Sequence, residues 1–305
     1  MAQKPKYISI LSDFGFKRAF ADESNTLFLR KSLEALIQSP TEIEIVEFLK
    51  NDVAGSTSIG RGMRFDTICR DADGNNFIVE MQLTPYDDFV QRAKFYAFHR
   101  FNTLIKKGLT NPFKGLPTIY SVNFLANDIF PNSKQYYHFA TLKNQINEEI
   151  DRQIVYIFVE ISKFDKKQDE LEEDADKLIY LMKNIEEIQQ TATLPPFLNE
   201  DWILQAMERL NEGGLTPDQR ANLEIAIVQE ASEIAAWKDQ LRKVEEAEAK
   251  AEEAEAKAEA KAEAKAAAKA KEVKIETAKK LKENGVNIQL IAESTGLSIE
   301  EVEQL

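Results

Sequence analysis

Residues 64 to 82 read RFDTICRDADGNNFIVEMQ and predict a β-hairpin. Two runs suited to strands, RFDTIC and FIVEMQ, flank the turn-like segment DADGN. A turn centred at or just after Asp73 sets the pairing of the two strands, and Asp66 then faces Glu80 or Met81. Opposed side chains in a strand pair have Cβ atoms about 4.5–5.5 Å apart, so two carboxylates placed there repel each other. The hairpin therefore needs a cation or a shared proton between them.

A divalent cation fits this hairpin. Side chains alternate along a strand, so Glu80 and Gln82 project to the same face and can converge with Asp66 on one point. Hard divalent cations such as Mg²⁺ are bound by one or two carboxylates together with water and substrate phosphate. Acidic residues in a hairpin can also serve only solubility, as Asp71 and Asp73 do in the turn. Asp66 and Glu80 have apolar neighbours along both strands, which weakens the alternative that they serve solubility alone.

Composition bounds the class of protein. The chain has 305 residues, of which 43% are hydrophobic, enough to build a core of useful size. A single cysteine, Cys69, excludes an intramolecular disulfide and predicts a cytoplasmic location. The first residues lack the long apolar run of a signal peptide, and no run of about 18 apolar residues predicts a transmembrane helix.

The net charge of −13 is unevenly distributed along the chain. Residues 1–120 carry 16 basic and 14 acidic side chains, whereas the remainder carries 23 basic and 38 acidic ones. Residues 89–127 contain six basic residues and no acidic residue. This local excess suits contacts with phosphates, and it also suits a solvated helix face.

The order of elements indicates a mixed α/β layer. Residues 12–38 predict helix, interrupted by the segment ADESN, and residues 42–50 predict a strand before the hairpin. A helix is expected at 87–108, with Arg92, Tyr96 and Arg100 on its outward side. Three further strands are expected at 117–125, 136–142 and 154–161.

The C-terminal part of the chain predicts helix almost throughout. A continuous helix from about 217 to 283 would be roughly 100 Å long at about 1.5 Å per residue. It contains the heptad EEAEAKA twice, at 245–251 and 252–258, and alanine, glutamate and lysine all favour helix. Residues 223–244 carry enough apolar side chains to pack on a partner. A solitary rod and a weak alanine coiled coil both remain open for the repeat itself.

Residues 284–305 predict two short helices around Gly296, with Ser298 and Glu301 as a capping box. This arrangement is typical of part of a helix-turn-helix. The second helix, SIEEVEQL, carries three glutamates and no basic residue, which duplex DNA would repel. An interaction or dimerisation tip is therefore favoured over a DNA reader.

Three blocks in this order resemble a known family. They are DFGFKRAF near the start, the hairpin RFDTICRDADGNNFIVEMQ, and QRAKFYAFHR after it. Together they resemble the recombination-promoting nucleases, also called PD-(D/E)XK nuclease family transposases, over roughly residues 8–210. The resemblance implies a restriction-endonuclease-like α/β core with a mixed sheet. The expected domains are a nuclease-like core at 8–165, a helical extension at 166–215, a long helix at 216–283 and a tip at 284–305.

The family implies a metal-dependent DNA endonuclease that acts in recombination or transposition. By its motif, Asp66 and Glu80 would bind Mg²⁺, with Ca²⁺ or Mn²⁺ as alternatives, and the Met81 backbone carbonyl would be a further ligand. Gln82 completes the catalytic set, but it stands where the superfamily has lysine. Glutamine orients water and carries no charge, so this departure puts the catalytic rate in question.

Weaker candidates surround this set. Asp13 and Lys17 lie in the first block and are possible accessory residues, and Arg92, Tyr96 and Arg100 are candidates for contacts with DNA. The expected partners are DNA and further copies of the chain, with no membrane. The competing hypothesis is a non-catalytic DNA-binding or scaffold protein that keeps the nuclease fold and assembles through its long helix.

Overall fold

A mixed sheet of six strands forms the centre of the first of two compact units in the computed structural model. The units are Met1–Ile234 and Ala235–Leu305. None of the helices in the described ranges combines the length and apolar character needed to cross a membrane. The structure describes residues 6–49, 52–53, 63–64, 66–83, 88–106, 108, 110–188 and 195–305.

The strand order in the sheet is β1-β4-β5-β6-β8-β7. Strands β5, β6 and β8 are parallel to one another, whereas β1, β4 and β7 run antiparallel to their neighbours. The carboxyl ends of the three parallel strands therefore meet at one edge, where Gln82, Leu125 and Glu160 are in register. The strands are β1 Ile45–Phe48, β4 Thr67–Asp71, β5 Asn76–Gln82, β6 Ile119–Leu125, β7 Tyr137–Lys143 and β8 Glu149–Glu160, with a separate ribbon of β2 Asp52–Val53 and β3 Met63–Arg64.

The hairpin predicted at 64–82 is confirmed as β4 and β5. Thr67 pairs with Val79 and Cys69 with Phe77, which is one of the two predicted registers. The turn depends on Gly74, whose φ of +88° lies in the left-handed region that favours glycine. Local chemistry in the turn therefore fixes which residues oppose each other further along the strands.

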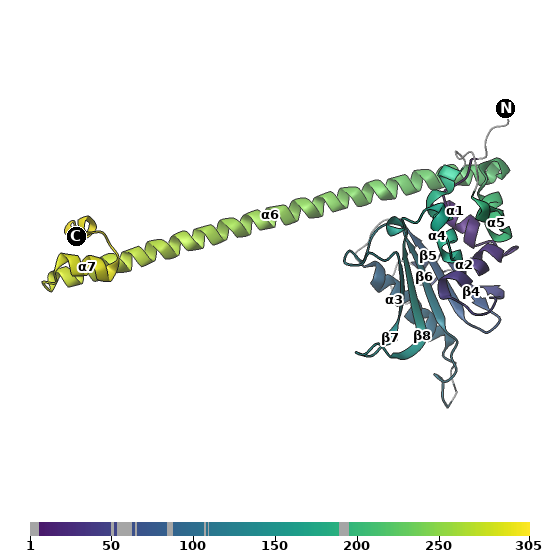
Figure 1. Ribbon diagram of the computed structural model, residues 1–305, viewed down its shortest axis with the longest axis horizontal. Helices are drawn as coiled ribbons and strands as arrows, with labels where there is room; N and C mark the ends of the chain where they lie inside the picture. The colour runs from purple at the N-terminus through teal and green to yellow at the C-terminus, as the bar shows by residue number, and fades with distance from the viewer. Residues whose placement is uncertain are drawn as a thin grey trace. The chain divides into compact units, whose positions relative to one another are not determined.

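Helices cover both faces of the sheet (Figure 1). Phe77 and Val79 face the layer of four helices, whereas Ile78 lies on the face covered by α3. Burial on both faces explains the nearly continuous apolar run of β5. The helices of this unit are α1 Asp13–Phe20, α2 Leu27–Ile37, α3 Phe89–Leu104, α4 Asp174–Ile188 and α5 Asp201–Leu210, with 3₁₀ turns at Ile161–Lys163, Gln168–Glu170, Pro196–Asn199 and Glu212–Gly214.

One expectation about α3 is wrong. Tyr96 was expected on the outward side, but only 5% of it is exposed, and it packs with Ile68 and Ile78. It follows Ala93 by three positions and so shares the buried face of the helix. Phe95 and Phe98 instead point outward, with 48% and 56% of their surface exposed.

The second unit contains the larger part of a long helix and two short helices. The predicted helix at 217–283 is confirmed as α6 Pro217–Glu283, which begins in the first unit. α7 Ile288–Thr295 and α8 Ile299–Glu303 pack on its last turns around a small core of Ala278, Ile291, Leu297 and Val302. The predicted capping box is confirmed, because Ser298 and Glu301 each accept a hydrogen bond from the other's backbone N–H. The domain boundaries drawn from the sequence stay predictions.

Glu160, at the end of β8, is a buried carboxylate that holds the segment following β6. It accepts hydrogen bonds from the backbone N–H groups of Ile129 and Phe130 at 2.6 and 2.9 Å. Lys163 Nζ and His138 Nε2 lie 2.7 and 2.8 Å from its other oxygen. Burial alone would raise the pKa of Glu160, but Lys163 and the two N–H groups outweigh it and lower the pKa.

We expect Glu160→Ala to lower the free energy of unfolding by about 3–5 kcal/mol, because it leaves a buried lysine without its anion. Urea denaturation measures this, with Glu149→Ala, an exposed position on the same strand, as a control expected to stay within about 0.5 kcal/mol. Since the folded pKa is lowered, this stabilisation is complete above the unfolded pKa of about 4.3 and disappears as the pH falls through the folded value. Equal effects of the two variants would contradict the prediction.

Candidate active site

Asp66 and Glu80 meet where the hairpin ladder ends. The backbone N–H of Asp66 donates to Glu80 Oε1 at 3.4 Å, and the backbone N–H of Met81 donates to Asp66 Oδ2 at 2.8 Å. The Glu80 side chain projects toward the α3 face of the sheet, and only 6% of the residue is exposed. The register of the hairpin therefore places the two carboxylates beside each other.

The surroundings of this pair oppose ionisation of both carboxylates at once. Burial raises the pKa of Glu80 well above its usual range, and the neighbouring Asp66 raises it further. Burial also raises the pKa of Asp66, although its bond from the Met81 N–H and the charge of Lys17 oppose this. A bound cation, or one proton shared by the pair, relieves the repulsion.

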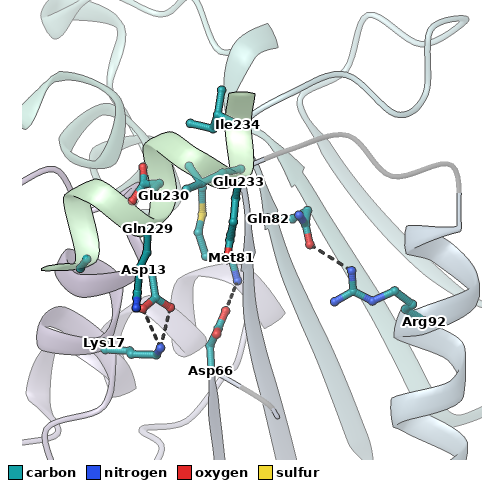
Figure 2. A pocket seen from close by; sticks show the side chains of 12 residues that line it. Asp13, Lys17, Asp66, Met81, Gln82, Arg92, Gln229, Glu230, Glu233 and Ile234 are labelled. Atoms are coloured by element: carbon teal, nitrogen blue, oxygen red, sulfur yellow. Dashed lines mark hydrogen bonds and ion pairs between the residues drawn. The ribbon is translucent and has the colours of Figure 1, made fainter. Parts of the chain in front are cut away.

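A pocket of about 430 Å³ opens beside the pair, with a basic side chain on each of two walls (Figure 2). On the α1 wall, Lys17 Nζ lies 2.6 Å from Asp13 Oδ1. On the α3 wall, Arg92 donates to the side-chain oxygen of Gln82 at 3.4 Å. Asp66 lies between these walls and so has a basic side chain on either side of it.

Most of the residues singled out in the sequence lie at this pocket. Glu80 is buried and does not line the pocket, but it contacts Asp66, which does. Two candidates for DNA contacts lie elsewhere. Tyr96 is buried under α3, and Arg100 donates to the Asn76 side chain at 2.7 Å, at the opposite end of β5. The predicted residues that line the pocket are Asp13, Lys17, Asp66, Met81, Gln82 and Arg92.

The first turns of α6 supply a wall that the sequence did not reveal. Gln229, Glu230, Glu233 and Ile234 line the pocket from this side (Figure 2). Burial raises the pKa of Glu230, and the Asp13 and Glu233 carboxylates add to the rise, although a backbone hydrogen bond with Asp13 opposes it. The apolar residues between 223 and 244 predicted a packing partner for this helix, but nothing in their spacing identified it.

The mixed sheet and the paired carboxylates of its hairpin define a restriction-endonuclease-like α/β protein. The family model described as PD-(D/E)XK nuclease family transposase matches residues 10–262, and the chain belongs to this family. This confirms the predicted family and fold class, while the predicted roles of individual residues stay predictions. Comparison with curated proteins gave no match, and comparison with solved structures gave none either.

We expect Glu80→Gln to raise the melting temperature at pH 7 in EDTA by roughly 2–4 °C, because about 1 kcal/mol of repulsion disappears while the amide oxygen still accepts a hydrogen bond. A carboxyl with a raised folded pKa loses stability as the pH rises from its unfolded pKa, about 4.3, through the folded value. The gain should therefore vanish near pH 4.

Thermal denaturation between pH 4 and 8 measures this difference. Glu149→Gln, exposed on β8, is the control and should show no gain at any pH. A lower melting temperature for Glu80→Gln at pH 7 would mean that the charge of Glu80 stabilises the metal-free fold, contrary to the argument.

Proposed function

We propose that the protein is a Mg²⁺-dependent endonuclease that hydrolyses phosphodiester bonds of DNA. The observation that carries the proposal is the convergence of Asp66 and buried Glu80 beside a pocket with Lys17 and Arg92 on its walls. A partly buried carboxylate beside a buried one suits a cation, and flanking basic side chains suit a phosphodiester. Membership of a nuclease family supports the same reaction class.

The number of available ligands favours Mg²⁺ or Mn²⁺ over Ca²⁺. Within the described part of the chain, no group of three or more acidic, histidine or cysteine side chains is placed to hold a metal. Mg²⁺ is bound through one or two carboxylates and keeps its remaining positions for water and substrate phosphate. Ca²⁺ takes six to eight oxygen ligands, more than this pair offers.

The Met81 backbone carbonyl is suited to join the pair. The Gln82 carbonyl accepts from the Ala126 N–H, so Gln82 presents its backbone groups toward β6. Adjacent residues in a strand present theirs to opposite neighbours, so Met81 faces β4, where Asp66 accepts its N–H. Asp66, Glu80 and this carbonyl would hold the cation, which when bound supplies Lewis-acid activation of the phosphodiester.

The other pocket residues position the substrate and water. Lys17 and Arg92 would bind non-bridging phosphate oxygens from opposite sides, and the planar guanidinium of Arg92 suits two oxygens at once. Asp13 holds the Lys17 ammonium in place. The Gln82 amide would orient the attacking water by hydrogen bonding, and since it carries no charge it does not act as the base.

The wider biological assignments belong to the same proposal. We infer a role in recombination or transposition, in the cytoplasm, for a chain that assembles as a homo-oligomer through α6. The alternative is a non-catalytic DNA-binding scaffold, and the observation that favours it is Gln82 at the position of the superfamily's lysine. Cleavage of DNA separates the two hypotheses.

We expect the full chain to nick supercoiled plasmid with Mg²⁺ and not with EDTA. Asp66→Ala and Glu80→Ala should each abolish nicking, because either change breaks the cation site. Gln82→Ala should cost about 10²-fold or less, as expected for a group that only positions water, and Gln82→Lys should remain active. Asp73→Ala, in the exposed turn, is the control.

Nicking that persists in EDTA would refute the cation site. A Gln82→Ala protein as inactive as Asp66→Ala, with its metal still bound, would refute the role given to glutamine. A wild-type chain that binds DNA but never nicks it would favour the scaffold.

We expect Glu230→Gln combined with Glu233→Gln to tighten DNA binding about three- to tenfold at 0.1 M salt, because the change removes two negative charges from the pocket that a DNA phosphate would enter. Fluorescence anisotropy measures this on an Asp66→Ala background, which prevents cleavage. The gain should shrink at higher salt, where the Debye length falls below about 10 Å. Glu224→Gln, exposed on the same helix outside the pocket, is the control, and weaker binding of the double variant would show that these glutamates assist DNA.

A further inference from the structure

Large aromatic side chains lie exposed on the outer side of α3 and in the loop after it. Phe98 is 56% exposed and Phe113 is 64% exposed. Phe95 is 48% exposed, and its ring lies nearly parallel to that of His99, with centroids 6.4 Å apart. Exposed rings gathered in this way mark a binding surface more often than single exposed apolar residues do.

Two of these rings, Phe98 and Phe113, line a second pocket of about 570 Å³, here called the α3 aromatic pocket. It lies between the C-terminal half of α3 and the strands β7 and β8, and Phe101 and Tyr156 add two more rings to its lining. The hydroxyls of Tyr156 and Thr141, which also line it, are buried and have no hydrogen-bond partner among the described residues. These hydroxyls lie below the surface, so the lining offers a ligand mainly aromatic and apolar faces.

The basic side chains of α3 and of the loop after it favour an anionic chain. Residues 89–127 carry six basic side chains and no acidic one, and Lys94, Lys106 and Lys114 among them are exposed. The carboxylate in the pocket lining is Asp151, on β8. Aromatic side chains interleaved with basic ones bind single-stranded nucleic acid, because the rings stack on bases and the cations contact phosphates.

The pocket and the candidate active site lie toward opposite ends of the central strands. Ile154, in the pocket lining, is in register with Ile119 and through it with Asn76, whereas Gln82 at the active-site pocket lies six residues further along β5. At about 3.3 Å per residue this is roughly 20 Å along the strands. A single strand of DNA that reaches both places therefore spans several nucleotides.

We propose that the α3 aromatic pocket receives an unpaired base of the DNA substrate, several nucleotides from the phosphodiester at the active site. The base stacks on the rings of Phe98 and Phe113. This inference rests on the proposed function for the identity of the substrate. It adds a site that reads bases to a site that acts on the backbone.

The test compares two single strands that share phosphates and differ in bases. The full chain with Asp66→Ala, in EDTA, is titrated into labelled oligothymidine and into an abasic strand of the same length, and anisotropy gives each affinity. The parent protein should bind oligothymidine about tenfold more tightly than the abasic strand. Phe98→Ala with Phe113→Ala should remove this preference and leave affinity for the abasic strand unchanged.

Matched variants separate stacking from general apolar contact. Phe98→Leu with Phe113→Leu keeps apolar bulk without rings and should also lose the preference. Ile146→Ala with Ile150→Ala, exposed positions outside the pocket, should keep it. Equal binding of the two strands by the parent protein overturns the proposal. The proposal is also overturned if the phenylalanine variants change only self-association, measured by analytical ultracentrifugation. That result would mean that the surface binds a second copy of the chain.

The binding assay does not depend on cleavage or on metal. If plasmid nicking fails while the base preference holds, the nuclease proposal is wrong and the pocket stands. If nicking succeeds while the preference is absent, the pocket proposal alone is wrong.

Discussion

Repulsion between two carboxylates at the end of one hairpin is the constraint on which the candidate site depends. Glu80 belongs to the central strand β5, which is buried on both faces, so its side chain lies among apolar neighbours and α3. Asp66 lies across from it and accepts the Met81 N–H. Each carboxylate raises the free energy needed to ionise the other. A fold that contains both therefore favours a bound cation.

The rest of the sheet supplies the rigidity that such a pair requires. Parallel pairing of β5, β6 and β8 places their carboxyl ends at one edge, and buried Glu160 fastens the segment that leaves β6 at this edge.

Local chemistry made the hairpin predictable, and long-range packing made the rest of the pocket unpredictable. The turn around Gly74 requires a left-handed residue, so a short sequence limited the register to two possibilities, and the structure has the one that places Asp66 opposite Glu80. The wall from α6 did not, because its residues follow the hairpin by about 150 positions in a helix whose pattern suits many partners.

α3 shows a different limit of sequence analysis. Aromatic or apolar residues occur all around this helix, so its buried face is wider than periodicity indicated, and Tyr96 was assigned to the wrong side. Arg100 was expected to contact DNA because of its charge; the structure shows it bonded to Asn76, and its contact with DNA stays a prediction. A basic residue on a helix is informative about phosphate contacts only when its neighbours in space are known.

The charges around the active-site pocket impose an order on the proposed reaction. Its lining carries two basic side chains, on Lys17 and Arg92, and the carboxylates of Asp13, Asp66, Glu230 and Glu233. This balance opposes a phosphodiester. A divalent cation held by Asp66 and Glu80 would offset the charge of that pair, and the remaining negative charge would then come from Asp13 and the α6 wall. In the proposed mechanism DNA binding would therefore be favoured by prior occupation of the cation site, and the acidic wall of α6 strengthens that requirement because it adds negative charge without adding a ligand to the pair.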